Sequence, residues 1–271
     1  MELNDFLVDD EFLRTFAIVA IGGLGLLVGS FLNVVIWRVP RGESIVSPPS
    51  ACPGCADTIQ ARDNVPVLSW VLLRGRCRAC RAPISMRYPL VEAGTGVMFA
   101  LVYLRVGPSV EVVAYLYLAA IGIALLLIDL DVKRLPNVIV LPAYLVLPVL
   151  LAVASAVDGD WSAMLRAAMG GMLLYAFYFG AMVAYPGGMG FGDVKLAGVL
   201  GIGLAWMGWG ALVVGAFGAF LLGGIFSIGL VLSKRAHRKT GIPFGPWMLA
   251  GAAIGIGWGE GIWGAYLSLM Q

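Results

Sequence analysis

Charged residues are scarce in this sequence. They make up 13% of its 271 residues, whereas hydrophobic residues make up 60% and the mean hydropathy is +0.91. A typical soluble domain carries about 25% charged residues. The shortage therefore excludes a soluble enzyme, a disordered chain and a coiled coil. Because the apolar runs are continuous rather than alternating with polar residues, they also disfavour a β-barrel. We predict an all-α polytopic membrane protein.

Histidine is equally scarce, because His237 is the single one. One histidine and no serine-centred nucleophile elbow give no sign of a serine hydrolase. His237 lies in the basic run 234–239, which we expect to face anionic lipid headgroups. The pair Gly23 and Gly25 lies inside an apolar segment rather than after a strand, so it is not a nucleotide-binding fingerprint. A net charge of +2 does not point to a nucleic-acid partner.

About eight apolar segments are long enough to suggest transmembrane helices, since crossing a bilayer takes about 20 apolar residues. They span residues 14–37, 89–105, 109–128, 137–157, 166–185, 195–209, 211–232 and 246–268. The stretch before the first segment is acidic, which indicates an uncleaved span rather than a removed signal peptide. We divide the chain into an acidic segment with its first helix (1–37), a loop domain (38–88) and a seven-helix membrane domain (89–271).

The basic residues predict the orientation of these helices. If the N-terminus lies outside, 15 of the 18 lysines and arginines fall in the inside loops, which favours that orientation. The inside loops are 38–88, 129–136, 186–195 and 233–245. We therefore expect both termini outside and the loop domain in the cytoplasm.

Four cysteines form two C-x-x-C pairs in this loop domain. Cys52 and Cys55 are separated by 21 residues from Cys77 and Cys80. Two such pairs are typical of a tetrahedral zinc site. The loop has few aliphatic residues, so a metal would supply the stability that a core cannot. Four thiolates leave no open position, which predicts one structural Zn²⁺ rather than a catalytic one.

Carboxylates at the edges of the apolar segments are the candidates for chemistry, since charge there is costly and usually functional. Asp129 and Asp131 end the third segment, and Asp193 begins the sixth. Two carboxylates brought together can share a proton and act as base and acid on a water and a peptide bond. Asp129 and Asp131 point to different sides of a helix, so only one of them meets Asp193. From the residues alone, a paired-aspartate protease, a proton-coupled transporter and a structural role stay open.

Several segments together resemble the type IV prepilin peptidase family, which contains the GxGD membrane aspartic proteases. The similar segments follow in the family's order, from about residue 25 to 250. They are GSFLNVVIWRVP at 29–40, the cysteine loop, APISMRYPLVE at 82–92, the stretch 129–137, GFGD at 190–193 and IPFGP at 242–246. One departure is Asn137, where many members have aspartate.

The resemblance implies a function and a catalytic pair. Such enzymes cleave the basic leader peptide of prepilins and pseudopilins after a glycine, at the cytoplasmic face of the bacterial inner membrane. Members with the cysteine loop then methylate the new N-terminal residue, commonly phenylalanine, with S-adenosylmethionine. The position of Leu135 relative to the family's first aspartate motif selects Asp129 over Asp131 as the partner of Asp193. A carboxylate-relay transporter and a non-catalytic assembly scaffold are the alternatives.

The methyltransferase site is predicted where the loop domain meets the second segment, at Arg87, Tyr88, Glu92 and Gly96. Glu92 is a costly charge at the start of a span unless it is paired. It either holds a substrate amine or a ribose hydroxyl, or it pairs with Arg38 or Arg87 and orients the loop.

Overall fold

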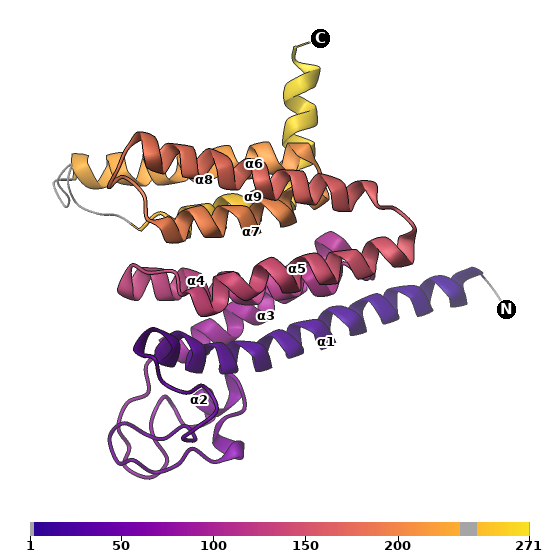
Figure 1. Ribbon diagram of the computed structural model, residues 1–271. Helices are drawn as coiled ribbons and strands as arrows, with labels where there is room; N and C mark the ends of the chain where they lie inside the picture. The colour runs from indigo at the N-terminus through magenta and orange to yellow at the C-terminus, as the bar shows by residue number, and fades with distance from the viewer. Residues whose placement is uncertain (1–2, 234–242, 271) are drawn as a thin grey trace. The chain divides into compact units, whose positions relative to one another are not determined.

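Long helices dominate the computed structural model, which describes residues 3–233 and 243–270 (Figure 1). A long helix covers most of each of the eight predicted apolar segments, and the residues described contain isolated bridges but no strand. The long helices are α1 (Leu3–Arg38), α3 (Arg87–Val106), α4 (Val112–Val132), α5 (Asn137–Asp158), α6 (Ser162–Ala184), α7 (Phe191–Met207), α8 (Trp209–Leu232) and α9 (Gly245–Ser268). The short helices η1 (Val39–Arg41), η2 (Ala61–Asp63) and α2 (Leu68–Leu72) lie between α1 and α3. The all-helical fold class is thus confirmed. The basic run 234–239 and Ile242 lie outside the described residues.

Two compact units make up the chain. The first contains the chain up to Val112 together with Ala119–Ala124, and the second contains Val113–Leu118 and the chain from Leu125 onward. The loop domain and the helices α1 and α3 belong to the first unit. Asp129, Asp193 and the helices α5 to α9 belong to the second.

Six helices within the described residues, rather than the predicted eight, are long and apolar enough to cross a membrane independently. They are α1 from Glu11 onward, α3, α4, α5, α6 and α8. The helix α7 has 17 residues, so it is only about 25 Å long, less than the ~30 Å hydrocarbon core. The helix α9 has 24 residues, and the many glycines among them dilute its apolar character. The number of such helices therefore differs slightly from the predicted count of about eight, although a helix occupies each of the eight places.

Glycines let α1 and α3 pack closely in the first unit. A Cβ atom on Gly25 would lie 2.8 Å from the Cα atom of Gly96, and one on Gly29 would lie 2.7 Å from the Cα atom of Glu92. A larger residue at either position would keep the two helices apart. Small residues promote helix pairing in membranes because they let the backbones approach closely.

The helix α7 forms the core of the second unit. Val194 and every residue from Leu196 to Trp206 are buried, so α7 is covered on all sides. On α6, Gly170 and Gly171 lie against the backbone of α7. On α9, Gly251, Gly255 and Gly259 lie against the backbone of α8.

Candidate functional site

The four cysteines of the first unit converge on one point. Their sulfur atoms all lie within 4.8 Å of one another, and the Sγ atoms of Cys52 and Cys80 are 3.7 Å apart. Four thiolates bound to zinc at about 2.3 Å in a tetrahedron would lie about 3.8 Å apart. The cluster thus has a size that fits one tetrahedral metal ion, as the spacing of the cysteines predicts.

The two C-x-x-C turns have the same backbone geometry. In each, the N–H of the first cysteine donates to a carbonyl five residues later, at 2.9 Å for Cys52 and 2.8 Å for Cys77. The residue after each second cysteine, Ala56 or Arg81, has a positive φ of 58° or 62°. Its N–H donates back to the carbonyl of the first cysteine, at 2.8 Å and 3.1 Å. The loop therefore presents two matching pairs of thiols.

The backbone around Cys52 favours its thiolate. The N–H of Gly54 lies 3.4 Å from the Cys52 Sγ atom. Donation from Gly54, and from the N–H of Cys55, lowers the pKa of the Cys52 thiol to about 7. Because metals bind the thiolate form, this backbone prepares the residue as a ligand.

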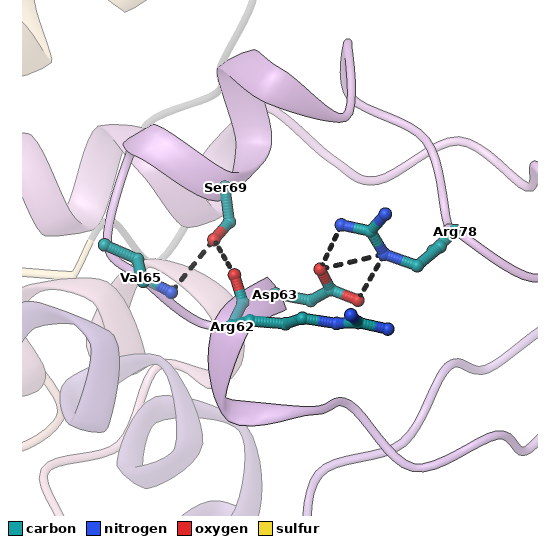
Figure 2. Close-up of polar contacts among 5 residues, drawn as sticks. All are labelled: Arg62, Asp63, Val65, Ser69 and Arg78. Carbon is teal, nitrogen blue, oxygen red and sulfur yellow. Dashed lines mark hydrogen bonds and ion pairs between the residues drawn. The ribbon is translucent and has the colours of Figure 1, made fainter.

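An ion pair that the sequence pattern does not predict joins two parts of the loop domain (Figure 2). The guanidinium group of Arg78, inside the second turn, donates to both carboxylate oxygens of Asp63 at 2.6–3.0 Å. The hydrogen bond from Arg78 lowers the pKa of Asp63. Nearby, the Ser69 hydroxyl accepts the N–H of Val65 at 3.0 Å and donates to the Arg62 carbonyl at 3.1 Å.

Glu92 also holds this loop, through a hydrogen bond to the loop's backbone. Its Oε2 atom accepts the N–H of Val67 at 2.7 Å, and only 8% of the residue is exposed. Val67 has a φ of +61°, which is strained for a β-branched side chain. The guanidinium group of Arg38, one predicted partner of Glu92, instead donates to the carbonyls of Ser44 and Pro48.

The other residues predicted for the methyltransferase site lie nearby on α3. Arg87 is the first residue of α3, and its N–H donates to the Ser85 hydroxyl at 3.2 Å. Gly96 faces α1, where a Cβ atom would meet Leu26. The Asn33 amide donates to the Tyr88 carbonyl at 3.3 Å, so it links α1 to α3.

Asp193 lies in the first turn of α7 in the second unit. Its Oδ2 atom accepts the N–H of Gly190 at 3.1 Å, which caps the helix. A carboxylate at this end of a helix also interacts favourably with the helix dipole. The GFGD segment therefore holds the carboxylate in place by its own backbone.

Asp129 lies near the end of α4 and is 4% exposed. Its Oδ2 atom has no hydrogen-bond partner among the residues that the structure describes. A Cβ atom on Gly245, the first residue of α9, would lie 2.7 Å from this oxygen. Only glycine therefore fits at position 245 without displacing the carboxylate.

Leu135 brings the segments of the two aspartates together. A Cβ atom on Gly192, the neighbour of Asp193, would meet the Leu135 side chain at 3.2 Å. A Cβ atom on Gly245 would meet the same side chain at 3.5 Å. Asp129 is also close enough to Asp193 for the two to interact electrostatically. Two such carboxylates can divide the roles of acid and base in hydrolysis.

Lys195 is a residue of this site that the sequence analysis does not single out. Its ammonium group donates to the Asn137 side chain at 2.9 Å and lies 4.6 Å from the centre of the Phe191 ring. Asn137 is the position that departs from the resembling family. The hydrogen bond joins the first residue of α5 to the fifth residue of α7. The sequence feature that indicates Lys195 is its place two residues after the aspartate, at the edge of an apolar segment.

The two family models that match the chain divide it close to the boundary between the two compact units. Residues 24–106 match the bacterial peptidase A24 N-terminal domain, and residues 116–228 match the type IV leader peptidase family. The prepilin leader peptidase/N-methyltransferase of Aeromonas hydrophila is 37% identical over 90% of this chain and 91% of that protein. Proteins of the same name from Pseudomonas putida and Neisseria gonorrhoeae are 35% and 34% identical, over 91% and 95% of this chain and 92% and 96% of those proteins.

No solved structure matches the chain. The sequence relatives cover nearly its whole length, and the family matches fall on the segments that carry the cysteine cluster and the two aspartates. The chain belongs to the type IV leader peptidase family.

Proposed function

We propose that this protein is a membrane aspartic endopeptidase in which Asp129 and Asp193 are the catalytic pair. The observation that carries the proposal is the convergence of Asp129, the GFGD turn and Gly245 around Leu135. Peptide hydrolysis by two carboxylates needs no metal and no nucleophilic side chain. It needs one carboxylate protonated and the other ionised, next to a water and the scissile bond.

The reaction follows from that arrangement. The ionised carboxylate takes a proton from water as the water oxygen attacks the scissile carbonyl carbon. The protonated carboxyl donates its proton to the carbonyl oxygen, which gives a neutral tetrahedral diol. Transfer of a proton to the peptide nitrogen then lets the carbon–nitrogen bond break. The products are a carboxylic acid and a free amine, and the aspartate pair returns to its singly protonated state.

The substrates are prepilins or pseudopilins with a basic leader peptide, cut after a glycine. Relatives of 34–37% identity are named prepilin leader peptidases. The distribution of basic residues favours an N-out orientation in a bacterial inner membrane. That orientation puts the ends of α4 and α7 that carry the aspartates at the cytoplasmic face. A prepilin helix in the same bilayer would present its leader junction there.

The second proposed activity is methylation of the new N-terminal amine with S-adenosylmethionine. The names of the relatives include N-methyltransferase, and the complete cysteine cluster is the part that the resembling bifunctional members have. We assign zinc to Cys52, Cys55, Cys77 and Cys80, where it would stabilise the loop. Within this loop and the start of α3, we place the cofactor near Arg87, Glu92 and Gly96. We assign the carboxylate of Glu92 to binding an amine or a hydroxyl.

The test is a cleavage assay in lipid vesicles with a prepilin that has a basic leader and a Gly-Phe junction. Mass spectrometry should find the leader removed after the glycine. With S-adenosylmethionine, the product should gain the mass of one methylene group. An intact prepilin with well-folded enzyme would contradict the peptidase. Cleavage without the mass gain would contradict the methyltransferase alone.

Gly245→Ala should lower the cleavage rate about 100-fold or more, because the new methyl group would lie 2.7 Å from the Asp129 Oδ2 atom. Displacing a catalytic group by about 1 Å costs on this order. The measurement is kcat in vesicles, with the melting temperature recorded alongside.

Gly261→Ala is the matched control on the same helix, since a Cβ atom there would meet nothing within 4 Å. It should keep the activity of the wild type. Equal activity of the two variants would mean that Gly245 does not set the position of Asp129.

A further inference from the structure

A groove runs along the second unit between α5 and α6, with α7 as its floor. Its volume is about 340 Å³. Tyr144 and Pro148 of α5 form one wall, Gly171 and Tyr175 of α6 form the other, and Ile202 of α7 lies at the base. These helices other than α7 have the length and hydropathy of membrane spans, so the groove lies at membrane depth.

The chemistry of the groove suits an apolar helix. Besides the residues named, it is lined by Met164, Ala168 and Met172. Ala168 and Gly171 are small enough for another backbone to approach, as at helix contacts in membranes. The two methionines adapt to side chains of varied shape. Met172 is 65% exposed, so the groove is open on this side.

The groove leads directly to Asp193 along α6. This helix runs antiparallel to α7, because Gly170 faces the carbonyl of Gly201, and Gly171 faces that of Gly198. The same register places Tyr178, seven residues after Gly171, beside the first turn of α7. Tyr178 and Asp193 are close enough to interact electrostatically. Tyr175, in the groove wall, is therefore only about 5 Å along the helix axis from the level of Asp193.

The other wall reaches the same end of α7. The Tyr144 hydroxyl donates to the carbonyl of Lys195 at 2.6 Å, two residues after Asp193. A substrate chain leaving the aspartate pair in the direction of the membrane would therefore enter the groove at Tyr144 and Tyr175.

We propose that this groove binds the apolar helix of the substrate, on the C-terminal side of the scissile bond. The proposal rests on the peptidase function proposed above. Met164 to Tyr175 cover about 16 Å of α6. A helical substrate beginning at the cleavage site would place residues about 3 to 14 along this length. Docking there fixes the scissile bond against the aspartates, and the leader itself makes no contact with the groove.

Continuity with the aspartates favours a substrate helix over a lipid tail as the occupant. A lipid would gain nothing from a groove that ends at a catalytic residue. A substrate helix gains orientation, which is the contribution that positioning makes to catalysis. The two occupants predict different values of KM. A side chain that fills the groove raises KM for the prepilin only if the prepilin helix binds there.

The experiment fills the groove and compares two substrates. Ala168→Leu places a larger side chain in it, and Ala176→Leu makes the same change at an exposed residue of α6 outside the lining. One substrate is a full-length prepilin in vesicles. The other is a soluble peptide that ends two residues after the scissile bond and so lacks the helix. Ala168→Leu should raise KM for the prepilin roughly tenfold. It should leave kcat/KM for the short peptide unchanged, and Ala176→Leu should change neither.

Unchanged KM for the prepilin in Ala168→Leu would overturn the proposal and leave a lipid tail as the occupant. If Ala168→Leu lost activity on both substrates, Met172→Ala, which enlarges the groove, would decide the matter. In Met172→Ala, a raised KM for the prepilin alone would support the proposal, and a parallel loss on both substrates would overturn it. A wild-type enzyme that cleaved neither substrate would instead contradict the peptidase function itself.

Discussion

Asp129→Asn and Asp193→Asn should each lower kcat for leader cleavage by about 1,000-fold or more, whereas Asp131→Asn should retain most of the activity. An amide can neither take a proton from water nor donate one as a carboxyl group does, so either change removes half of the acid–base pair. General acid–base catalysis by a single group contributes about 10²–10⁴ to a rate. Removing one member of a pair that acts as a unit costs the contribution of both. The measurement is single-turnover cleavage of a prepilin in vesicles.

Both substitutions should leave the fold intact, which makes the kinetic result interpretable. In Asp193→Asn, the remaining amide oxygen can still accept the Gly190 N–H that Asp193 accepts at 3.1 Å. In Asp129→Asn, the altered position is the buried Oδ2 atom, which has no partner among the described residues. We therefore expect melting temperatures within about 4 °C of the wild type, because loss of the interaction with the helix dipole costs only about 0.3–1 kcal/mol, and unchanged substrate binding. The double variant should be no slower than the slower single variant. Substantial cleavage by Asp193→Asn would contradict the mechanism and favour a scaffold or a transporter.

The sequence predicts the helices well because their signal is local. Continuous apolar runs place seven of the long helices within about four residues of where the structure has them, whereas α1 begins eleven residues before its predicted segment. One glycine every four residues, at Gly251, Gly255 and Gly259, is typical of a packing face on a membrane helix, and these glycines do contact α8. Hydropathy is less informative for α7. Its 17 residues look like the weakest span, yet they form the most enclosed helix of the second unit. Its neighbours rather than lipid cover it, and a hydropathy scale does not separate these environments.

The cysteine cluster is equally predictable, because spacing alone fixes which thiols can meet. The residues that hold the loop around them are not. Asp63 and Arg78 are 15 residues apart, and Val67 and Glu92 are 25 apart. Such contacts depend on how an irregular loop folds in three dimensions. No periodic pattern in the sequence predicts that path. The same applies to Lys195 and Asn137, which are 58 residues apart in the chain and 2.9 Å apart in the structure.

Removal of the metal should unfold the loop domain and abolish methylation, while cleavage persists. The loop between α1 and α3 buries few residues, among them Cys52, Ser69 and Gly75, so it lacks a core that would hold it without a metal. Binding of structural zinc supplies about 10–16 kcal/mol in small zinc domains, which exceeds what the loop's hydrogen bonds and its Asp63–Arg78 pair can replace.

The aspartates and their supporting glycines belong to the second unit, and none of the cysteines do. Hydrogen exchange over residues 45–85 should therefore rise after chelation, with a fall in methyl transfer and less than a tenfold change in cleavage. Added zinc should restore the chelated wild type but not Cys77→Ser. Elemental analysis would show whether the chelated protein is free of metal. If hydrogen exchange in the metal-free protein stayed slow, the loop domain would fold without zinc. An equal loss of methylation and cleavage would mean that the loop domain also supports the peptidase.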